Sequence, residues 1–382
     1  MRGFRSAALL SVVAALALTA CGGDATSSNS SSAGGDTSAA GTVDAKTATS
    51  LADFGGMEGL EAAAKAEGAL NTIALPHDWA NYGLIIDAFK KKYPEITVNE
   101  QSPDASSKEE IAAAEANKGT DKAPDVFDVG TNVALESTSY FAPYKVEKFD
   151  DIPEDQKEAT GLWVSDYTGV MVVGYNKTKY GEIKSIDELT DPKFAGSVAV
   201  NGKPAEAGAA FNGFLLANAA SGGDFSNFQP GLDYFKKLND AGTLNVTDVT
   251  NGTIDAGEHG VVFDWSYNHA SHTARLGEQG VEWATFVPND ITLGSYYKQA
   301  INVDAPHPAA ARLWQEFLYS PEAQNLWAEG GAVPVLNVLY ADEFSDAAKA
   351  NAPTVESLLS PTAEEADAAT KFLQENWDKT VS

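Results

Sequence analysis

The sequence predicts an α/β protein in which two sets of alternating strands and helices follow one another. The first observation is a strand–helix–strand unit of about 30 residues over 70–99, the size of a βαβ unit. The second is that the same alternation begins again after residue 169. The third is length, because the ~330 residues after the N-terminal region exceed the size at which one hydrophobic core stops growing. Strands that alternate with helices indicate mainly parallel sheets flanked by helices.

The first set is read from hydrophobic periodicity and from the residues that stop helices. Pro94, for example, ends the apolar helical spacing that precedes it. The expected elements, in order, are a helix at 51–68 that ends on Gly68, a strand at 70–76, a helix at 80–93, a strand at 96–99, a helix at 107–118 and a strand at 126–129.

The second set has the same rhythm. Its expected elements are a strand at 169–175, a short helix at 185–189, a strand at 197–200, helices at 205–220 and 230–240, and a strand at 260–263. Nearer the C-terminus an apolar stripe at 313–318 predicts a helix. Ser320 and Pro321 then have the types typical of an N-cap and a first helical position. A final amphipathic helix is expected at 362–377.

The N-terminus has the pattern of an export signal. Arg2 and Arg5 precede an apolar run over 7–20 that ends at Cys21, and this run is shorter than the ~20 residues that span a bilayer. The segment looks like a bacterial lipoprotein signal, which implies cleavage of residues 1–20 and acylation of Cys21. An ordinary secretory signal with a chance cysteine is the alternative. Residues 21–50 are rich in Ser, Gly, Ala and Thr and predict a flexible tether.

Composition excludes several classes of function. The formal net charge is −28, and removal of residues 1–20 leaves 24 basic against 54 acidic residues, a charge of −30. So acidic a surface does not bind nucleic acid or anionic lipid through bulk charge. A single cysteine excludes a disulfide framework and, once acylated, a thiol nucleophile. No cofactor is expected.

Candidate binding residues follow from the rule that open α/β sheets bind ligands beyond the carboxyl ends of their strands. In these loops aromatic residues stand next to carboxylates, as in the Asp78–Trp79 and Asp264–Trp265 pairs. The candidates are His77, Asp78, Trp79, Thr131, Asp166, Tyr167, Asn201, Lys203, Asp264, Trp265, Tyr267, Tyr296, Tyr297 and Lys298. The structural alternative is that some of these rings fill a seam between lobes and that some of the acids cap helices.

Aromatic rings beside carboxylates favour a cationic amine, because an ammonium over a ring gains ~0.5–2 kcal/mol and a carboxylate adds a charge-assisted hydrogen bond. Lys203 and Lys298 would suit an anionic group, so a zwitterion fits the whole set. A metal is not expected otherwise, but Tyr267, Tyr296 and Tyr297 are the candidate ligands if the solute is ferric ion. Two further residues, His269 and His272, are interpreted as a solvated helix face.

Four stretches, 66–98, 161–180, 185–211 and 294–336, together resemble the substrate-binding lipoproteins of bacterial ABC importers. The resemblance is strongest to the type II group that binds ferric ion, polyamines, thiamine or aminoethylphosphonate. It implies two α/β lobes, 51–167 plus 294–335 and 168–293 plus 336–382, that close on a ligand in the cleft between them. It also implies a monomer, lipid-anchored to the outer face of the cell membrane, that delivers its solute to an ABC permease.

The expected function is therefore capture of a small charged solute, most simply an amine such as a polyamine, a thiamine-like compound or an aminophosphonate. Ferric-ion binding is the alternative. An enzyme is not expected, since the chain has no GxSxG or HExxH motif. Thiamine-degrading enzymes that share the fold need a cysteine that this chain lacks. A hydrolase or transferase on the same fold is the remote alternative.

Overall fold

The computed structural model describes residues 43–353 and 358–381. The expected signal (1–20), Cys21 and residues 22–42 of the expected tether lie outside these residues. The last part of the expected tether is not free: Ala48 is 3% exposed, and its carbonyl accepts a 2.8 Å hydrogen bond from Arg312 Nε. The expectation of a flexible tether was therefore wrong for residues 46–50, which pack on the folded domain. Within the described ranges, no helix combines the length and apolar character needed to cross a bilayer.

The expected strand–helix–strand unit is present. Strand β1 (Ala69–Ile73) pairs in parallel with β2 (Thr97–Gln101), and α2 (Tyr82–Lys92) connects them. The preceding helix, α1 (Met57–Glu67), ends at Gly68, as expected, where φ is 72°. It begins later than expected because two glycines with positive φ, at 55 and 56, separate it from a short 3₁₀ turn, Leu51–Phe54.

A four-stranded sheet is built around β12 (Lys298–Asn302), which comes from the C-terminal part of the chain. Three strands pair with it antiparallel: β3 (Val126–Val129), β4 (Phe141–Ala142) and β5 (Val164–Ser165). The register sets Gln299 opposite Asp128. This pairing therefore brings two residues that are far apart in sequence to one place beneath the site described below.

A five-stranded sheet has the order β11–β7–β10–β8–β9. Its strands are β7 (Met171–Asn176), β8 (Val198–Ala199), β9 (Leu244–Asn245), β10 (Val261–Trp265) and β11 (Trp283–Phe286). Strand β8 runs parallel to β9 and β10, whereas β7 runs antiparallel to β10 and β11. A small sheet joins β6 (Tyr167–Thr168) to β13 (Val333–Pro334). The α/β class is confirmed, and its strand pairing is more mixed than the sequence predicts.

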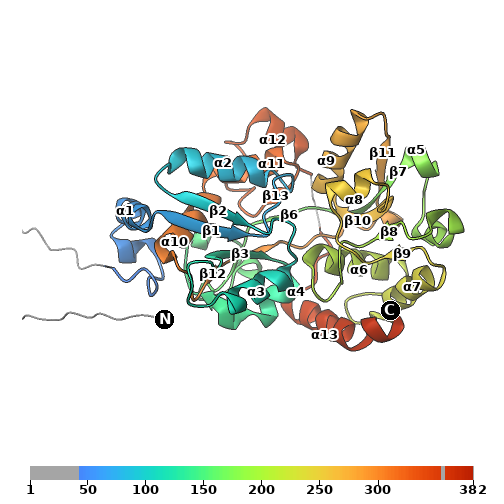
Figure 1. The fold of residues 1–382 in the computed structure, drawn as a ribbon, viewed down its shortest axis with the longest axis horizontal. Coiled ribbons are helices and arrows are strands. Elements are labelled where there is room, and N and C mark those ends of the chain that lie inside the picture. The colour runs from blue at the N-terminus through green and yellow to red at the C-terminus, as the bar shows by residue number, and fades with distance from the viewer. Residues whose placement is uncertain (1–42, 354–357, 382) are drawn as a thin grey trace, which may run out of the picture. The chain divides into compact units, whose positions relative to one another are not determined.

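Helices flank these sheets (Figure 1). Helices α1, α2 and α10 lie around β1, β2 and β12, and α5 to α9 lie around the five-stranded sheet. The remaining helices are α3 (Ser107–Ala116), α4 (Thr131–Glu136), α5 (Lys177–Tyr180), α6 (Gly208–Ala220), α7 (Gln229–Asp240), α8 (Asn251–Asp255), α9 (Ser266–Gly277), α10 (Pro308–Leu318), α11 (Pro321–Glu329), α12 (Asp346–Asn351) and α13 (Ala363–Thr380). The short helix expected at 185–189 is a 3₁₀ turn, Ile186–Thr190.

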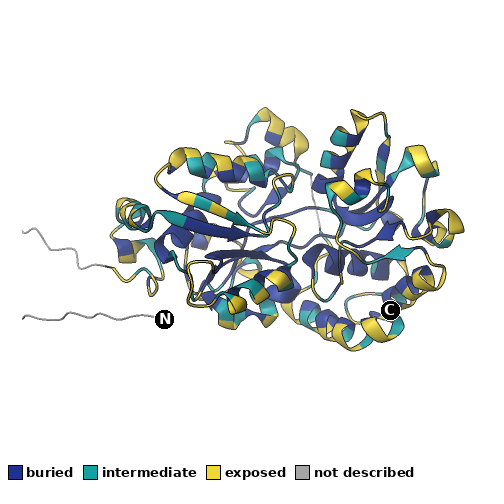
Figure 2. Cartoon of the chain, viewed as in Figure 1, coloured by how far each residue is buried: buried dark blue, intermediate teal, exposed yellow. Residues whose placement is uncertain are grey.

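The core lies on both faces of the central strands. Every residue of β10 and β12 is buried, and α6 is buried around most of its circumference. Figure 2 shows the central strands dark blue and the outer faces of the helices yellow, whereas the edge strand β2 is partly exposed. Strands covered on both faces read as nearly continuous apolar runs, which is why the sequence shows β7 and β10 so clearly.

Candidate functional site

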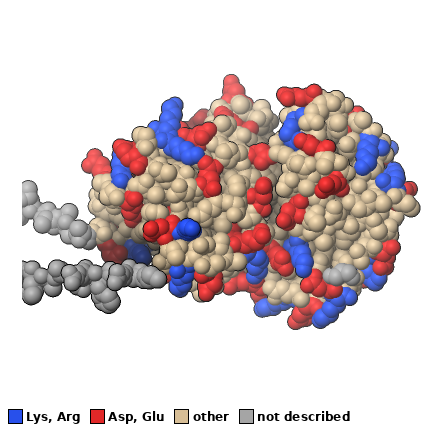
Figure 3. Space-filling view, in the orientation of Figure 1, with Lys and Arg blue, Asp and Glu red and all other residues tan. Residues whose placement is uncertain are grey.

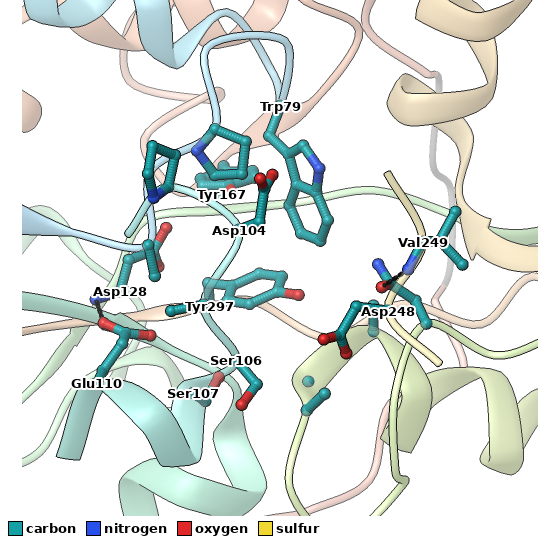
Figure 4. A pocket seen from close by; sticks show the side chains of 18 residues that line it. Trp79, Asp104, Ser106, Ser107, Glu110, Asp128, Tyr167, Asp248, Val249 and Tyr297 are labelled. Carbon is teal, nitrogen blue, oxygen red and sulfur yellow. Dashed lines mark hydrogen bonds between the residues drawn. The ribbon is translucent and has the colours of Figure 1, made fainter. Parts of the chain in front are cut away.

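A pocket opens where loops that follow β1 and β2 approach the start of α6. We call it the main pocket, and about 620 Å³ of space free of atoms lies in it, including its open mouth. Its lining residues are Ala74, Pro76, Trp79, Pro103, Asp104, Ala105, Ser106, Ser107, Glu110, Asp128, Tyr167, Asn201, Ala207, Gly208, Ala209, Asp248, Val249 and Tyr297 (Figure 4). Four residues nominated from the sequence therefore lie together here: Trp79, Tyr167, Asn201 and Tyr297.

Aromatic rings form part of its wall. Trp79 meets Tyr297 edge to face at 6.3 Å between centroids, and Tyr167 stacks on Tyr297 at 5.7 Å. The Tyr297 hydroxyl accepts a hydrogen bond of 3.2 Å from Trp265 Nε1, which fixes the ring. Figure 4 shows the Trp79 and Tyr297 rings on neighbouring sides of the same space. Trp265 is therefore a support of the pocket rather than part of its lining.

Four carboxyl groups line the main pocket. Asp104 and Asp248 are exposed, whereas Glu110 and Asp128 are buried. The Glu110 carboxyl accepts the backbone N–H of Asp128 at 3.0 Å. Burial raises the pKa of Glu110 well above its usual range. Among the described residues that line this pocket, none is Lys, Arg or His. The wall is therefore rich in acceptors of hydrogen bonds and has no basic side chain.

A buried polar network supports Asp128 from behind. The Tyr82 hydroxyl donates to Asp128 at 2.7 Å, and Gln299 Nε2 donates to Asp166 and to the Tyr82 oxygen at 2.9 Å each. Burial raises the pKa of Asp166 to about 7. Burial, and then the charge of Asp166, raise the pKa of Asp128 as well. The sequence nominates Asp166, but the structure places its neighbour Asp128 at the pocket.

A second, smaller cavity adjoins the first. We call it the side pocket. Its lining residues are Asp78, Trp79, Asp104, Val249, Thr250, Asn251, Asp264, Asn268 and His272. Trp79, Asp104 and Val249 line both pockets. Asn251 Nδ2 donates to Asp78 at 2.6 Å, which joins the loop after β1 to helix α8. Two acids nominated from the sequence, at 78 and 264, therefore lie in the side pocket.

Two more nominated side chains lie near these pockets without lining the main one. Tyr267 is buried, and its ring lies 6.2 Å from that of Trp79 and stacks on Trp265 at the same distance. The exposed His77 ring pairs with Glu100, away from both pockets.

Four nominated residues lie elsewhere. Thr131, Tyr296 and Lys298 line a separate cavity. Lys298 Nζ donates to Ser165 at 2.6 Å there, and burial lowers its pKa to about 8. Lys203 lies in another surface cavity, where its Nζ is 3.3 Å from Asp378. The structure thus brings neither lysine into the main or the side pocket.

The expectation for the two helical histidines was wrong. His269 and His272 are 1% and 6% exposed, because Trp283 of β11 packs on them with ring centroids 6.0 and 5.8 Å away. Burial lowers the pKa of His272 to about 4, so its ring is neutral at pH 7. Across the described residues, no three His, Cys, Asp or Glu side chains come together as a metal site.

Four acids that line the main pocket were not predicted from the sequence: Asp104, Glu110, Asp128 and Asp248. Asp128 carries the one available signal, because it lies near the carboxyl end of an apolar strand. The other three reach the pocket from the start of α3 and from the loop after β9, whose positions depend on tertiary packing.

Helix α6 reaches the pocket by a close backbone contact. A Cβ on Gly208 would lie 3.0 Å from the Gly130 Cα and 3.2 Å from the Tyr297 ring. A Cβ on Gly130 would lie 2.6 Å from the Gly208 Cα, so glycine at 130 lets the first turn of α6 approach the end of β3 this closely.

Comparison with known proteins agrees with this architecture. The chain matches the family described as "Bacterial extracellular solute-binding protein" over residues 121–361. No curated protein sequence matches the chain significantly.

Solved structures with the same fold cover most of the chain. The periplasmic binding protein AfuA from Actinobacillus pleuropneumoniae, with fructose-6-phosphate bound, is 20% identical over 82% of this chain and 98% of its own, with a TM-score of 0.63. Iron-bound HitA from Pseudomonas aeruginosa is 18% identical over 81% and 98%, with a TM-score of 0.57. AgtB from A. tumefacien R10, in complex with agropinic acid, is 14% identical over 82% and 98%, with a TM-score of 0.63.

These likenesses establish the fold, and the family match covers well over half of the chain. The resemblance inferred from the four sequence stretches is confirmed. The chain belongs to the bacterial extracellular solute-binding protein family, whose members work outside the cytoplasm and supply a small solute to an ABC permease.

Proposed function

We propose that this protein captures a small amine-bearing solute as its cation and delivers it to its permease. The observation that carries the proposal is the main pocket's lining of four carboxyl groups and three aromatic rings, without a basic side chain among its described residues. An ammonium gains ~0.5–2 kcal/mol over an aromatic face, and hydrogen bonds to charged groups contribute about 1.5–3 kcal/mol each. A polyamine, a thiamine-like compound and an aminophosphonate all carry such a group.

We assign the capture step to closure of two lobes, expected at 51–167 with 294–335 and at 168–293 with 336–382. Residues 336–351 pack against α11 and so go with the first lobe, since Ser345 Oγ and Asn351 Nδ2 both donate to Glu329. Residues from both assigned lobes line the main pocket, among them Asp104 and Asp248. The Asp78–Asn251 hydrogen bond and the 3.2 Å bond from the Lys108 N–H to the Glu206 carbonyl also join the two lobes. Partial contacts from each lobe then add up only in the closed state, which is how a ligand shifts such an equilibrium.

Attachment to the membrane is part of the same proposal. Acylation of Cys21 would tether the protein, as a monomer, to the outer face of the cell membrane. The Ser-, Gly- and Ala-rich residues between Cys21 and the folded domain would supply the reach needed to meet the permease.

Ferric-ion binding has less support. Of the three tyrosines that would ligate iron, Tyr296 lines a different cavity from Tyr297. Tyr267 is buried and lines neither the main pocket nor the side pocket. HitA has iron bound, but at 18% identity its likeness to this chain concerns the fold and not the ligand.

The test is a thermal-shift and calorimetric panel of putrescine, thiamine, 2-aminoethylphosphonate, ferric citrate and a neutral sugar. We expect an amine to raise the melting temperature, since ligand at 100 times its dissociation constant adds ~2.7 kcal/mol to stability. A shift with the sugar or with ferric citrate, and none with any amine, would contradict the proposal.

The Asp104→Asn variant tests whether the amine binds in the main pocket. Asp104 is exposed, so the variant should fold normally and lose affinity for the amine about tenfold, because one negative charge is lost at the wall of both pockets. Asp290→Asn is the matched control, since Asp290 is also exposed and lines neither pocket. Its backbone φ of 57° suits asparagine.

A further inference from the structure

The side pocket adjoins the main pocket and shares its wall. Trp79, Asp104 and Val249, which Figure 4 labels in the main pocket, also line the side pocket, so the two pockets meet beside the Trp79 indole. The two pockets are therefore separated only by side chains that line both.

The side pocket is acceptor-rich. Asp78, Asp104 and Asp264 are its carboxyl groups, and among its described lining residues His272 is the one basic group. That ring is neutral at pH 7 because it is buried. The nearby Arg275, which does not line the pocket, is ion-paired with Asp255. Nothing basic in the lining therefore neutralises the three acids.

Buried polar groups in this lining lack the partners that such groups normally have. Asn268 is 2% exposed, and although its amide lies close to the Asp264 carboxyl, neither of its polar atoms makes a well-aligned hydrogen bond. His272 Nδ1 and Asn251 Oδ1 also have none. Unpartnered buried polar atoms cost about 1–3 kcal/mol each, which a bound group with several N–H donors would recover.

The Asp264 carboxyl is held ready for such a group. The backbone N–H of Trp265 donates to its Oδ1 at 2.7 Å, and the Asn268 and Asn201 amides lie beside the carboxyl. Burial raises the pKa of this carboxyl to about 7, because these neighbouring donors offset only part of the cost of removing its charge from water. A cation in the side pocket would offset the rest.

We infer that the side pocket is a second cation subsite, so that the solute carries two cationic groups, one in each pocket, separated by the edge of the Trp79 indole. This inference rests on the proposed function and narrows it: the preferred solute is a dication whose second end bears several N–H donors. An aminophosphonate, whose second end is anionic, is disfavoured by the three acids of this pocket.

The experiment compares 1-butylamine, putrescine and 2-aminoethylphosphonate by calorimetry at pH 8. The first two have the same carbon chain and differ in one ammonium group. We expect putrescine to bind at least tenfold more tightly than butylamine. Asp264→Asn should reduce the affinity for putrescine about tenfold and change that for butylamine less than twofold, because Asp264 lines only the side pocket.

Two further variants control this result. Asp248→Asn, in the main pocket alone, should weaken both amines by the same factor. Asp78→Asn, at an exposed position of the side pocket, should repeat the selective loss and serves as the test if Asp264→Asn fails to fold. Equal affinity for the two amines, or tightest binding of the aminophosphonate, would overturn the subsite and leave the proposed function standing. Failure of every amine to bind would overturn both.

Discussion

Asp264 shows how a single buried carboxyl links binding chemistry to stability. It is 2% exposed, and burial raises its pKa from 3.8 to about 7. The folded protein therefore keeps a proton on this group at pH values at which the unfolded chain has released it. Since the folded state binds more protons between pH 4 and 7, the contribution of Asp264 to the free energy of unfolding falls as pH rises through that range.

Asp264→Asn tests this linkage in the free protein. The variant removes the titration and keeps the shape, so it should have nearly the same melting temperature as the parent at pH 4 to 5. At pH 8 it should melt several degrees higher, because the parent then carries a poorly compensated buried charge. Melting curves of both proteins at half-unit pH steps give the difference. A difference that does not grow with pH would show that Asp264 is not protonated in the folded state.

At the residue scale the sequence predicts the ring at Trp79 and the ring at Tyr297 but misassigns the neighbours of the latter. Side chains along an extended chain point alternately to opposite faces. Tyr297 therefore faces the main pocket, whereas Tyr296 and Lys298 line the cavity on the other side. The sequence alone does not show that residues 296–298 are extended, because that conformation depends on the pairing of β12 with β3. The three side chains were therefore assigned to one site.

At the scale of elements, the approach of α6 to β3 shapes the main pocket. Gly130 stands at the start of α4 with φ of −60°, which any residue adopts, so only the space around it requires glycine there. A Cβ at this position would lie 2.6 Å from the Gly208 Cα, a contact with backbone that no side-chain movement relieves.

Gly130→Ala should accordingly push the first turn of α6 away from β3 and widen the pocket. Overpacking of this kind costs ~1–3 kcal/mol. We expect a lower melting temperature and about a tenfold loss of affinity for the solute that binds the parent. Gly277→Ala, where no atom lies within 4 Å of the new Cβ, is the control and should match the parent in both measurements. Unchanged affinity in Gly130→Ala would separate this contact from binding.

Long periodic elements are the ones that the sequence predicts well. Helices α2, α3, α7, α10, α11 and α13 lie within a few residues of their expected positions, and the βαβ unit has the expected parallel pairing. Two-residue strands such as β4, β6 and β13 carry too little pattern to be read, since they exist only through their partners. Helix α9 was anticipated as a helix, but its burial depends on β11, which the sequence did not predict.

For the whole molecule, helix α13 connects regions that are far apart in the sequence. Trp377 packs on Phe214 and Phe235, with ring centroids 6.2 and 5.3 Å away. Three residues earlier along α13, Gln374 donates a 2.6 Å hydrogen bond to Glu136 of α4. One helix thus touches both α6–α7 and α4, and the sequence, which predicted the helix, gave no indication of this bridging position.

Two substitutions separate the contributions of α13. Trp377→Ala removes a 4% exposed aromatic side chain and should lower the free energy of unfolding by about 3–5 kcal/mol. Gln374→Ala removes an exposed hydrogen bond and should cost less than about 1 kcal/mol. Denaturant titration of both variants gives these values. Comparable losses for the two would mean that α13 is held by the polar contact rather than by its aromatic anchor.

The net negative charge of the chain produces an electrostatic field that extends beyond the pockets. The 54 acidic residues against 26 basic ones leave a strongly negative surface, and Figure 3 shows several of the acids near the middle of one face. Such a field draws positively charged molecules inward from several ångströms away, and dissolved salt weakens it beyond ~10 Å at 0.1 M. The proposed cationic solute should therefore associate with the protein faster at low salt than at high salt, with no change in any contact inside the binding site.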